Sequence, residues 1–175
     1  MQHGPNTIRT MDHNGELDPI DLQILAALRK DARFSNKELA AMVGLAPSSC
    51  LQRVRRLEER GVLRGYHAEV DPAALGVGMQ AMVAIRLSRH SRSLVDSFRE
   101  HILRTPEVRA LYHVAGASDF LLQVAVRDAE HLRELVLGSL TVRPEVAHVE
   151  TALIFEMVVN RELPVKHAAP SSKAK

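Results

Sequence analysis

The chain has 175 residues, 46% of them hydrophobic, and 23 Lys and Arg against 21 Asp and Glu give it a net charge of +2. This length favours two small domains over one. The single cysteine excludes an intrachain disulfide framework and a cysteine-rich zinc site. No apolar run approaches the ~20 residues of a membrane span, and residues 1–15 lack the apolar core of a secretion signal, so we expect a cytoplasmic protein without a membrane partner.

The first predicted element is a helix that begins at Pro19. Asp18 is a typical N-cap residue, and proline suits the first helical position because it has no N–H to leave unpaired. The apolar residues at helical spacing form a stripe that we expect to be buried, and they are Ile20, Ile24, Leu25 and Leu28.

Two further helices are predicted around a tight turn between residues 35 and 61. Ser35 and Glu38 have the spacing of a capping box at the start of the first of them. Gly44 is placed to end that helix in a left-handed cap. The pattern is typical of a helix-turn-helix, whose second helix enters the major groove of DNA.

The second helix of this pair is predicted from Pro47 to Arg60, and its two faces differ. Its apolar arc consists of Cys50, Leu51, Val54 and Leu57. The opposite arc suits DNA, because arginine can bond guanine, glutamine adenine, and serine a base or a phosphate. The side chains on that arc are Ser48, Ser49, Gln52, Arg53 and Arg56. Arg55 and Arg60 flank this arc and are predicted to contact backbone phosphates.

The alternative is a solvated surface helix in which Arg53, Arg56 and Glu59 only pair with one another at i,i+3 spacing. The capped helix and the turn before it favour the DNA-binding interpretation. Because the chain is almost neutral, its affinity for DNA would come from this local arginine cluster, repeated in a dimer or a larger assembly.

Residues 62–70 alternate between apolar and polar side chains, which predicts a strand, and residues 71–78 contain one proline and two glycines, which predicts a hinge linker. The sequence thus divides into a flexible N-terminus (1–16), a helix-turn-helix domain with a winged-helix character (17–70), the hinge (71–78), a second domain (79–163) and a disordered basic tail (164–175).

The second domain is predicted to follow the order strand, helix, strand, strand, helix, strand of a ferredoxin-like α+β fold. Its strands are expected at residues 79–88, 108–116, 118–126 and 146–159, the last one burying Val149, Leu153, Phe155 and Met157. Residues 118–126 carry apolar side chains on both faces, so we expect a second subunit to cover the sheet face that the helices leave open.

The turn at residues 115–119 admits two interpretations. Gly-Ala-Ser-Asp is an ordinary hairpin turn. Alternatively, Gly116 allows consecutive N–H groups to point at a carboxylate, and Asp119 offers a negative charge to an ammonium group, as a zwitterionic amino acid requires.

In order and spacing, the LDPIDLQIL start, the NKELA helix, the RVRRLEERGV run, the GYHA segment and VAGASDFLLQV resemble the Lrp/AsnC family of bacterial and archaeal regulators. The resemblance covers residues 17 to about 163. It implies a sequence-specific transcription factor whose binding to double-stranded DNA is tuned by an amino-acid effector. It also implies that the domains pair sheet to sheet, as a homodimer that assembles further to a tetramer or octamer at the nucleoid.

The same resemblance assigns the effector site to Ala115, Gly116, Ala117, Ser118, Asp119, Phe120 and Thr151. One departure is Ala46, which stands where the family usually has a serine before the second helix of the pair and which cannot cap it with a side chain. The identity of the amino acid does not follow from these residues.

Two other functions remain as alternatives to a transcription factor. Some haem-pathway decarboxylases resemble the family in both domains, and an effector-binding module could use its helix-turn-helix only for assembly. No P-loop, nucleophile elbow or cysteine–histidine dyad is present, and the nine histidines are scattered without ligand spacing. We therefore expect no enzymatic activity, no metal and no cofactor other than the effector.

Overall fold

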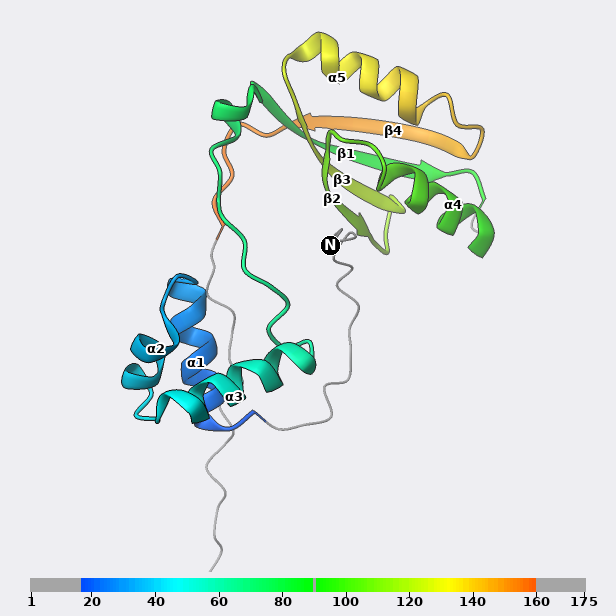
Figure 1. Cartoon of the computed structure of the whole chain (residues 1–175). Coiled ribbons are helices and arrows are strands. Elements are labelled where there is room, and N and C mark those ends of the chain that lie inside the picture. Colours follow the sequence, from blue (N-terminus) through cyan, green and yellow to red (C-terminus); the bar gives the residue numbers. More distant parts are fainter. Residues whose placement is uncertain (1–16, 90, 160–175) are drawn as a thin grey trace, which may run out of the picture. The chain divides into compact units, whose positions relative to one another are not determined.

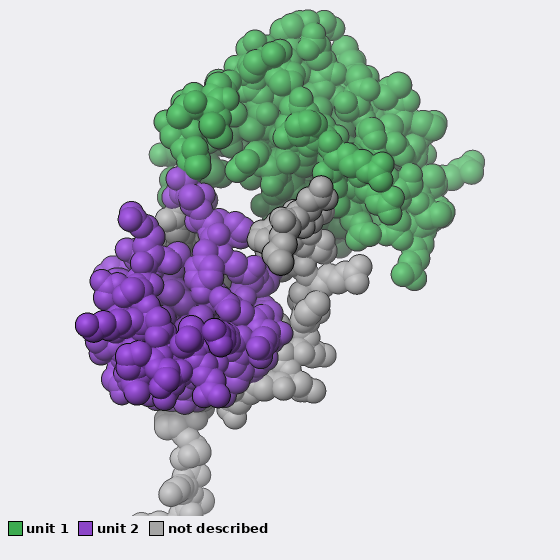
Figure 2. Space-filling view, in the orientation of Figure 1, with its two compact units in different colours: residues 1–5, 70–158 green, residues 6–69, 159–175 purple. Residues whose placement is uncertain are grey.

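The computed structural model describes residues 17–89 and 91–159, which form two compact units, residues 17–69 and residues 70–158 (Figure 2). The predicted flexible N-terminus and basic tail lie outside the described residues. Within the described ranges, no helix is long and apolar enough to cross a membrane.

The first unit consists of three helices, α1 (Pro19–Lys30), α2 (Asn36–Met42) and α3 (Pro47–Glu59), shown in blue to cyan in Figure 1. The predicted caps are confirmed: the Asp18 side chain accepts from the Asp21 N–H, and Ser35 and Glu38 form a reciprocal capping box. Gly44 has a φ of 69° and ends α2 as predicted. The three helices enclose one small core, which includes Ile24, Leu28, Leu39, Ala40, Cys50 and Leu57.

The strand predicted at residues 62–70 is wrong, because this segment has neither helix nor strand structure. Alternation of apolar and polar side chains favours an extended chain, but a strand also needs a neighbour for its backbone N–H and C=O groups. Tyr66 and Val70, two of the apolar residues in this alternation, are exposed.

The second unit contains β1 (Met79–Leu87), α4 (Arg92–Ile102), β2 (Val108–His113), β3 (Phe120–Val126), α5 (Ala129–Leu135) and β4 (Val146–Leu153). The strands form one antiparallel sheet in the order β2-β3-β1-β4 (Figure 1). This is the predicted ferredoxin-like arrangement. A π-helical turn, Val136–Leu140, directly extends α5.

Both helices of this unit pack on the same face of the sheet. The buried side chains alternate along the central strands, Ala81, Val83, Ile85 and Leu87 from β1 and Phe120, Leu122, Val124 and Val126 from β3. Phe98 and Ile102 of α4 and Leu132 and Leu135 of α5 complete this core. On the opposite face, Met82, Ala84, Leu121 and Ala125 are only half-buried.

The last strand is shorter than predicted. β4 ends at Leu153, and its pairing with β1 finishes where the Ile154 N–H donates to the Gln80 carbonyl oxygen. β1 begins one residue earlier, so the chain after Ile154 has no further ladder to join. The side chain of Phe155, predicted to be buried, is therefore 97% exposed, and those of Leu153 and Met157 are also exposed.

The predicted hinge at residues 71–78 contains a short 3-10 helix, Pro72–Leu75, capped by the Asp71 side chain. Its last residue is tied to the sheet, since the Gly78 N–H donates to the Val126 carbonyl oxygen. A Cβ at Gly78 would lie 2.3 Å from the Arg127 carbonyl oxygen, so only glycine allows this close approach. The segment is thus built into the second unit.

Candidate nucleic-acid interface and effector turn

The exposed arc of α3 is the candidate DNA-contacting surface of the first unit. Ser48, Ser49 and Gln52 of this arc are exposed, as predicted, and so is the flanking Arg55. The helix is held against α2 at its start, because the Asn36 side-chain amide donates to the Pro47 carbonyl oxygen at 2.7 Å. As expected from the sequence, Ala46 makes no side-chain hydrogen bond to the first turn of α3.

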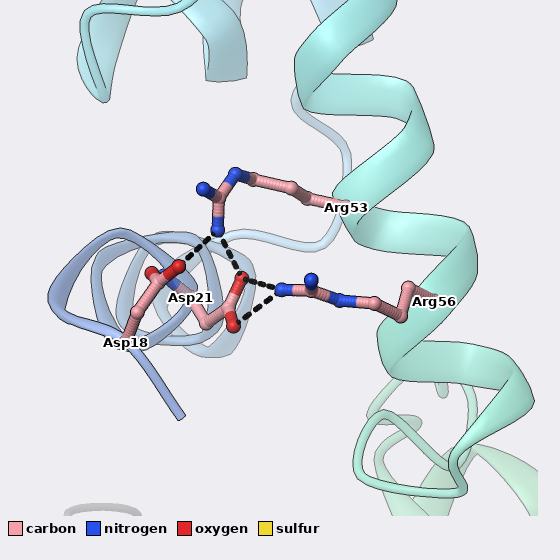
Figure 3. A network of polar contacts seen from close by, with 4 residues as sticks. All are labelled: Asp18, Asp21, Arg53 and Arg56. Carbon is pink, nitrogen blue, oxygen red and sulfur yellow. Dashed lines mark hydrogen bonds and ion pairs between the residues drawn. The ribbon is translucent and has the colours of Figure 1, made fainter. Parts of the chain in front are cut away.

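Arg53 and Arg56 lie differently from the rest of the predicted set. Both reach from α3 to the N-terminal end of α1, where they meet Asp18 and Asp21 (Figure 3). Arg53 Nη1 donates to Asp18 Oδ2 at 2.5 Å and to Asp21 Oδ1 at 2.9 Å. Arg56 Nη2 donates to both oxygens of Asp21, at 3.1 and 2.8 Å.

These ion pairs surround a buried carboxylate. The side chain of Asp21 is 1% exposed, whereas those of Arg53 and Arg56 are 26% and 49% exposed. Hydrogen bonding to Arg53 and to the Asp21 backbone lowers the pKa of Asp18, and the same contact with Asp18 raises the pKa of Arg53. The network therefore stabilises the charged forms of Asp18 and Arg53, and it joins α3 to α1.

The helical periodicity of the sequence favoured an outward position for both arginines and did not indicate their partners. A signal was nevertheless present, because Asp18 and Asp21 are three residues apart on one helix and Arg53 and Arg56 three apart on another. Side chains at i and i+3 share a helix face, so the two pairs match in spacing and are opposite in charge. Whether any α3 side chain contacts DNA stays a prediction.

The candidate effector turn joins β2 to β3. Gly116 has a φ of 145°, and a Cβ there would meet no atom within 4 Å, so the turn is open on that side. The N–H groups of residues 115–118 donate no hydrogen bond to any residue that the structure describes. Consecutive N–H groups of this kind can donate hydrogen bonds to an anion. Whether this turn binds an effector stays a prediction.

Asp119, at the end of this turn, makes hydrogen bonds that stabilise the sheet. Its backbone N–H donates to the Ile85 carbonyl oxygen, and its side-chain Oδ2 accepts from the Leu87 N–H at 2.7 Å. The carboxylate thus continues the β1–β3 pairing past its last backbone pair, Ile85 with Phe120. An ammonium group bound here would share the carboxylate with the Leu87 N–H.

Two predicted effector residues are not part of the open turn. The side chain of Phe120 is fully buried between Phe98 and His113, with ring centroids 5.0 and 4.8 Å away, so it is a core residue. Thr151 lies on β4, two strand spacings or about 10 Å from β3. Within one chain, the structure does not bring Thr151 to the turn.

Thr151 instead lines a separate hollow of about 320 Å³ beside α5. Its other walls come from residues that were not predicted to belong to the effector site, Ala129, Leu132, Arg133, Val136 and Leu137. A helical apolar stripe looks the same whether it ends in a core or at a surface hollow, so no local signal marked them. In the described part of the chain, no group of three or more His, Cys, Asp or Glu could hold a metal ion.

Two family models match consecutive parts of the chain. A winged helix-turn-helix DNA-binding model matches residues 17–64, and an Lrp/AsnC ligand binding domain model matches residues 80–164. The chain is 48% identical to the HTH-type transcriptional regulator AldR of Mycolicibacterium smegmatis over 152 residues, 87% of this chain and 86% of that protein.

Other relatives agree with these matches. The chain is 39% identical to the leucine-responsive regulatory protein of Rhizobium meliloti over 143 residues, 82% of this chain and 92% of that protein. A crystal structure of a transcriptional regulator from Neisseria meningitidis in complex with L-Met matches with a TM-score of 0.80 at 29% identity. The match covers 87% of this chain and 99% of that one.

Proposed function

Because the chain belongs to the Lrp/AsnC family of transcriptional regulators, we propose that it binds operator DNA through α3 and that an amino acid bound to its second unit modulates this binding. The observation that carries the DNA-binding half is the exposed polar arc of α3, held in place by α2. The proposal places the protein at the nucleoid in the cytoplasm, without an enzymatic role.

Base reading is assigned to the exposed side chains near the start of α3. Ser48, Ser49 and Gln52 stand on the exposed arc, where serine and glutamine can bond base edges in the major groove. Arg55, exposed, and Arg60, half-buried at the end of α3, are assigned to phosphates.

The nearly neutral charge of the chain supports binding as an oligomer. Each subunit has a net charge of only +2, so two recognition helices acting on one duplex would provide the missing electrostatic attraction. We expect a homodimer that assembles to a tetramer or an octamer, and an operator with two related half-sites.

The effector is assigned to the turn at residues 115–119. The open N–H groups of residues 115–118 would hold its carboxylate, and Asp119 would hold its ammonium group. The leucine-responsive relative and the L-Met complex of the Neisseria regulator support an amino acid as the class of effector. Thr151 and its hollow would contribute only where another subunit brings them near a turn.

A thermal-shift screen with the twenty amino acids tests the effector half. We expect one or a few of them to raise the melting temperature of the wild-type protein, because a ligand that binds only the folded state stabilises it. Asp119→Asn should abolish that rise, since it removes the negative charge. The amide oxygen can still accept from the Leu87 N–H, so the melting temperature without ligand should change little. An undiminished rise in this variant would exclude Asp119 from the site.

The DNA half is tested with a duplex that the wild-type protein selects from a random-sequence library. Gln52→Ala should lower the affinity for this duplex by about tenfold, the value of one good base contact, and leave the affinity for a scrambled duplex unchanged. Equal effects on both duplexes would contradict base reading by Gln52, and a wild-type protein that selects no sequence would contradict the proposed function itself.

A further inference from the structure

Arg53 and Arg56 are the arginines of α3 that the sequence most strongly suggested as DNA contacts, yet both are bonded to α1. Their partner Asp21 belongs to the first turn of α1, and Asp18 is the N-cap of the same helix. Both helices contribute to the small core of the unit, but α3 packs mainly against α2. The polar network of Asp18, Asp21, Arg53 and Arg56, here named the α1–α3 clamp, is thus a polar connection between α1 and α3 at the edge of that core (Figure 3).

We propose that Arg53 and Arg56 are positioning residues, which fix the orientation of α3 through Asp21 and leave base reading to Ser48, Ser49 and Gln52. This inference rests on the proposed DNA-binding function of α3. It changes the role of two arginines and assigns an acidic residue, Asp21, a part in specific DNA binding.

The position of Arg53 on the helix agrees with this role. At 100° per residue, Arg53 lies only about 60° from the buried Cys50, whereas Gln52 lies about 160° from it. Arg53 therefore borders the core rather than the exposed arc, and its side chain is the less exposed of the two arginines.

The burial of Asp21 makes the clamp hard to open. If both arginines turned toward DNA phosphates, a carboxylate that is 1% exposed would lose its positive partners in a site of low polarity, which is strongly unfavourable. Asp18 cannot replace them, because it is itself an anion. At least one arginine must therefore stay on Asp21 when the domain meets DNA.

Only one nitrogen of each guanidinium group takes part in the clamp contacts described above. Arg53 and Arg56 each contact the aspartates through a single terminal nitrogen. Such contacts fix the distance between the two helices, but they lack the paired geometry in which both terminal nitrogens of an arginine bond one carboxylate. A small rotation of α3 about its axis would stretch these contacts and would move Gln52 relative to the bases.

Neutralising Asp21 tests the proposal, because electrostatics and positioning predict opposite signs. Removing a negative charge from a DNA-binding domain should strengthen its attraction to any duplex. If Asp21 positions α3, Asp21→Asn should instead lower the affinity for the selected duplex by about tenfold, the value of one well-placed base contact. Its affinity for a scrambled duplex should be unchanged or higher.

Glu59→Gln provides the matched control. This exposed residue of α3 loses the same charge but is not part of the clamp. The control should strengthen binding to the selected and scrambled duplexes alike. If Asp21→Asn behaves like Glu59→Gln, the positioning role is wrong.

A second pair of variants covers the case in which Asp21→Asn does not fold. Arg56→Lys keeps a charged donor for Asp21, whereas Arg56→Gln removes the charge. Positioning predicts that Arg56→Gln loses discrimination between the two duplexes without changing the salt dependence of binding to the scrambled one, and that Arg56→Lys restores the discrimination. A direct phosphate contact predicts instead that Arg56→Gln lowers the affinity for both duplexes equally. It also predicts that the slope of log affinity against log salt concentration falls in magnitude by about one per contact.

The two positions should also be coupled. In the double variant Asp21→Asn, Arg56→Gln, the loss of affinity for the selected duplex should be clearly smaller than the product of the two single losses. If the loss in the double variant equals the product of the two single losses, Arg56 acts on DNA independently of Asp21, and the proposal is overturned. Failure of the proposed function is distinguishable, because the wild-type protein would then show no preference between the duplexes.

Discussion

Asp18 combines two functions in one carboxylate. Its Oδ1 accepts the Asp21 N–H as the N-cap of α1, and its Oδ2 accepts from Arg53. Both partners stabilise the charged form, so the pKa of Asp18 lies below its ordinary value. A carboxylate with a lowered pKa in the folded state stabilises the fold above its unfolded pKa and loses this contribution as the pH falls through the folded one.

We therefore predict that Asp18→Asn makes the protein less sensitive to acid. Asparagine still caps α1, so the variant removes the ion pair with Arg53 but keeps the cap. The melting temperature of the wild-type protein should exceed that of the variant at neutral pH, and the difference should shrink once the pH falls below about 4. Thermal melts at a series of pH values measure this, and a difference that is independent of pH would contradict the role of the charge.

At the level of single residues, the capping residues were predictable and the clamp was not. Ser35, Glu38 and Gly44 act within a few residues of their own helix ends, so their spacing along the chain contains the necessary information. Arg53 and Asp21 are 32 residues apart, and only the packing of α3 beside α1 brings them together.

Among the α-helices of the described residues, α3 lacks a side-chain cap, whereas α1, α2, α4 and α5 each have one. Ala46 occupies the N-cap position with φ −65° and ψ 144°, the backbone geometry that capping residues adopt, but it has no oxygen to accept an N–H. Two other features favour the start of α3: Pro47 stands at its first position, and the Asn36 side-chain amide donates to the Pro47 carbonyl oxygen.

Ala46→Ser is predicted to stabilise the protein by about 1 kcal/mol, because the serine hydroxyl can accept an N–H of the first turn of α3. Ala41→Ser, at an exposed position inside α2, is the control and should be neutral or slightly destabilising. Denaturant unfolding measures both. A gain that is equal in the two variants would show that the cap is not its cause.

For strands, the alternation of side chains predicted the face that each residue occupies but not where pairing stops. β1 and β3 alternate as predicted because each has a neighbour on both sides. Residues 62–70 alternate in the same way without a neighbour, and β4 ends where β1 no longer offers backbone groups. Both differences have one cause, which is that hydrogen-bond partners come from distant parts of the chain.

At the scale of the whole molecule, the sheet face that α4 and α5 do not cover is the surface on which we expect another subunit to pack. Leu121 lies opposite Ala84 on this face, and both are half-buried although no helix of the unit packs there. Met157, from the segment after β4, reaches part of this face, since its sulfur accepts from the Gln123 side-chain amide. Apolar side chains, among them Met82 and Ala125, lie on this face beside polar ones such as Gln80, and an apolar surface of this kind can be buried between subunits.

We predict that Leu121→Lys shifts the protein from oligomer to monomer, because a charge on this face would have to be desolvated in a sheet-to-sheet interface. Ser88→Lys adds the same charge at an exposed position after β1 and should leave the assembly unchanged. Sedimentation velocity distinguishes the species. If Leu121→Lys remains oligomeric and folded, the subunits associate through another surface.

By itself, the sequence determined the helices with their caps, the order of elements in the second unit and the alternation of side chains along its central strands, because these depend on contacts between residues close in the chain or on simple periodicity. Only the tertiary structure decided that Arg53 and Arg56 bond to a buried aspartate, that Asp119 is shared with the Leu87 N–H, and that Thr151 stands apart from the turn. Each of these is set by which elements become neighbours in space. That choice follows from the combined packing of the elements, which no local stretch of sequence contains.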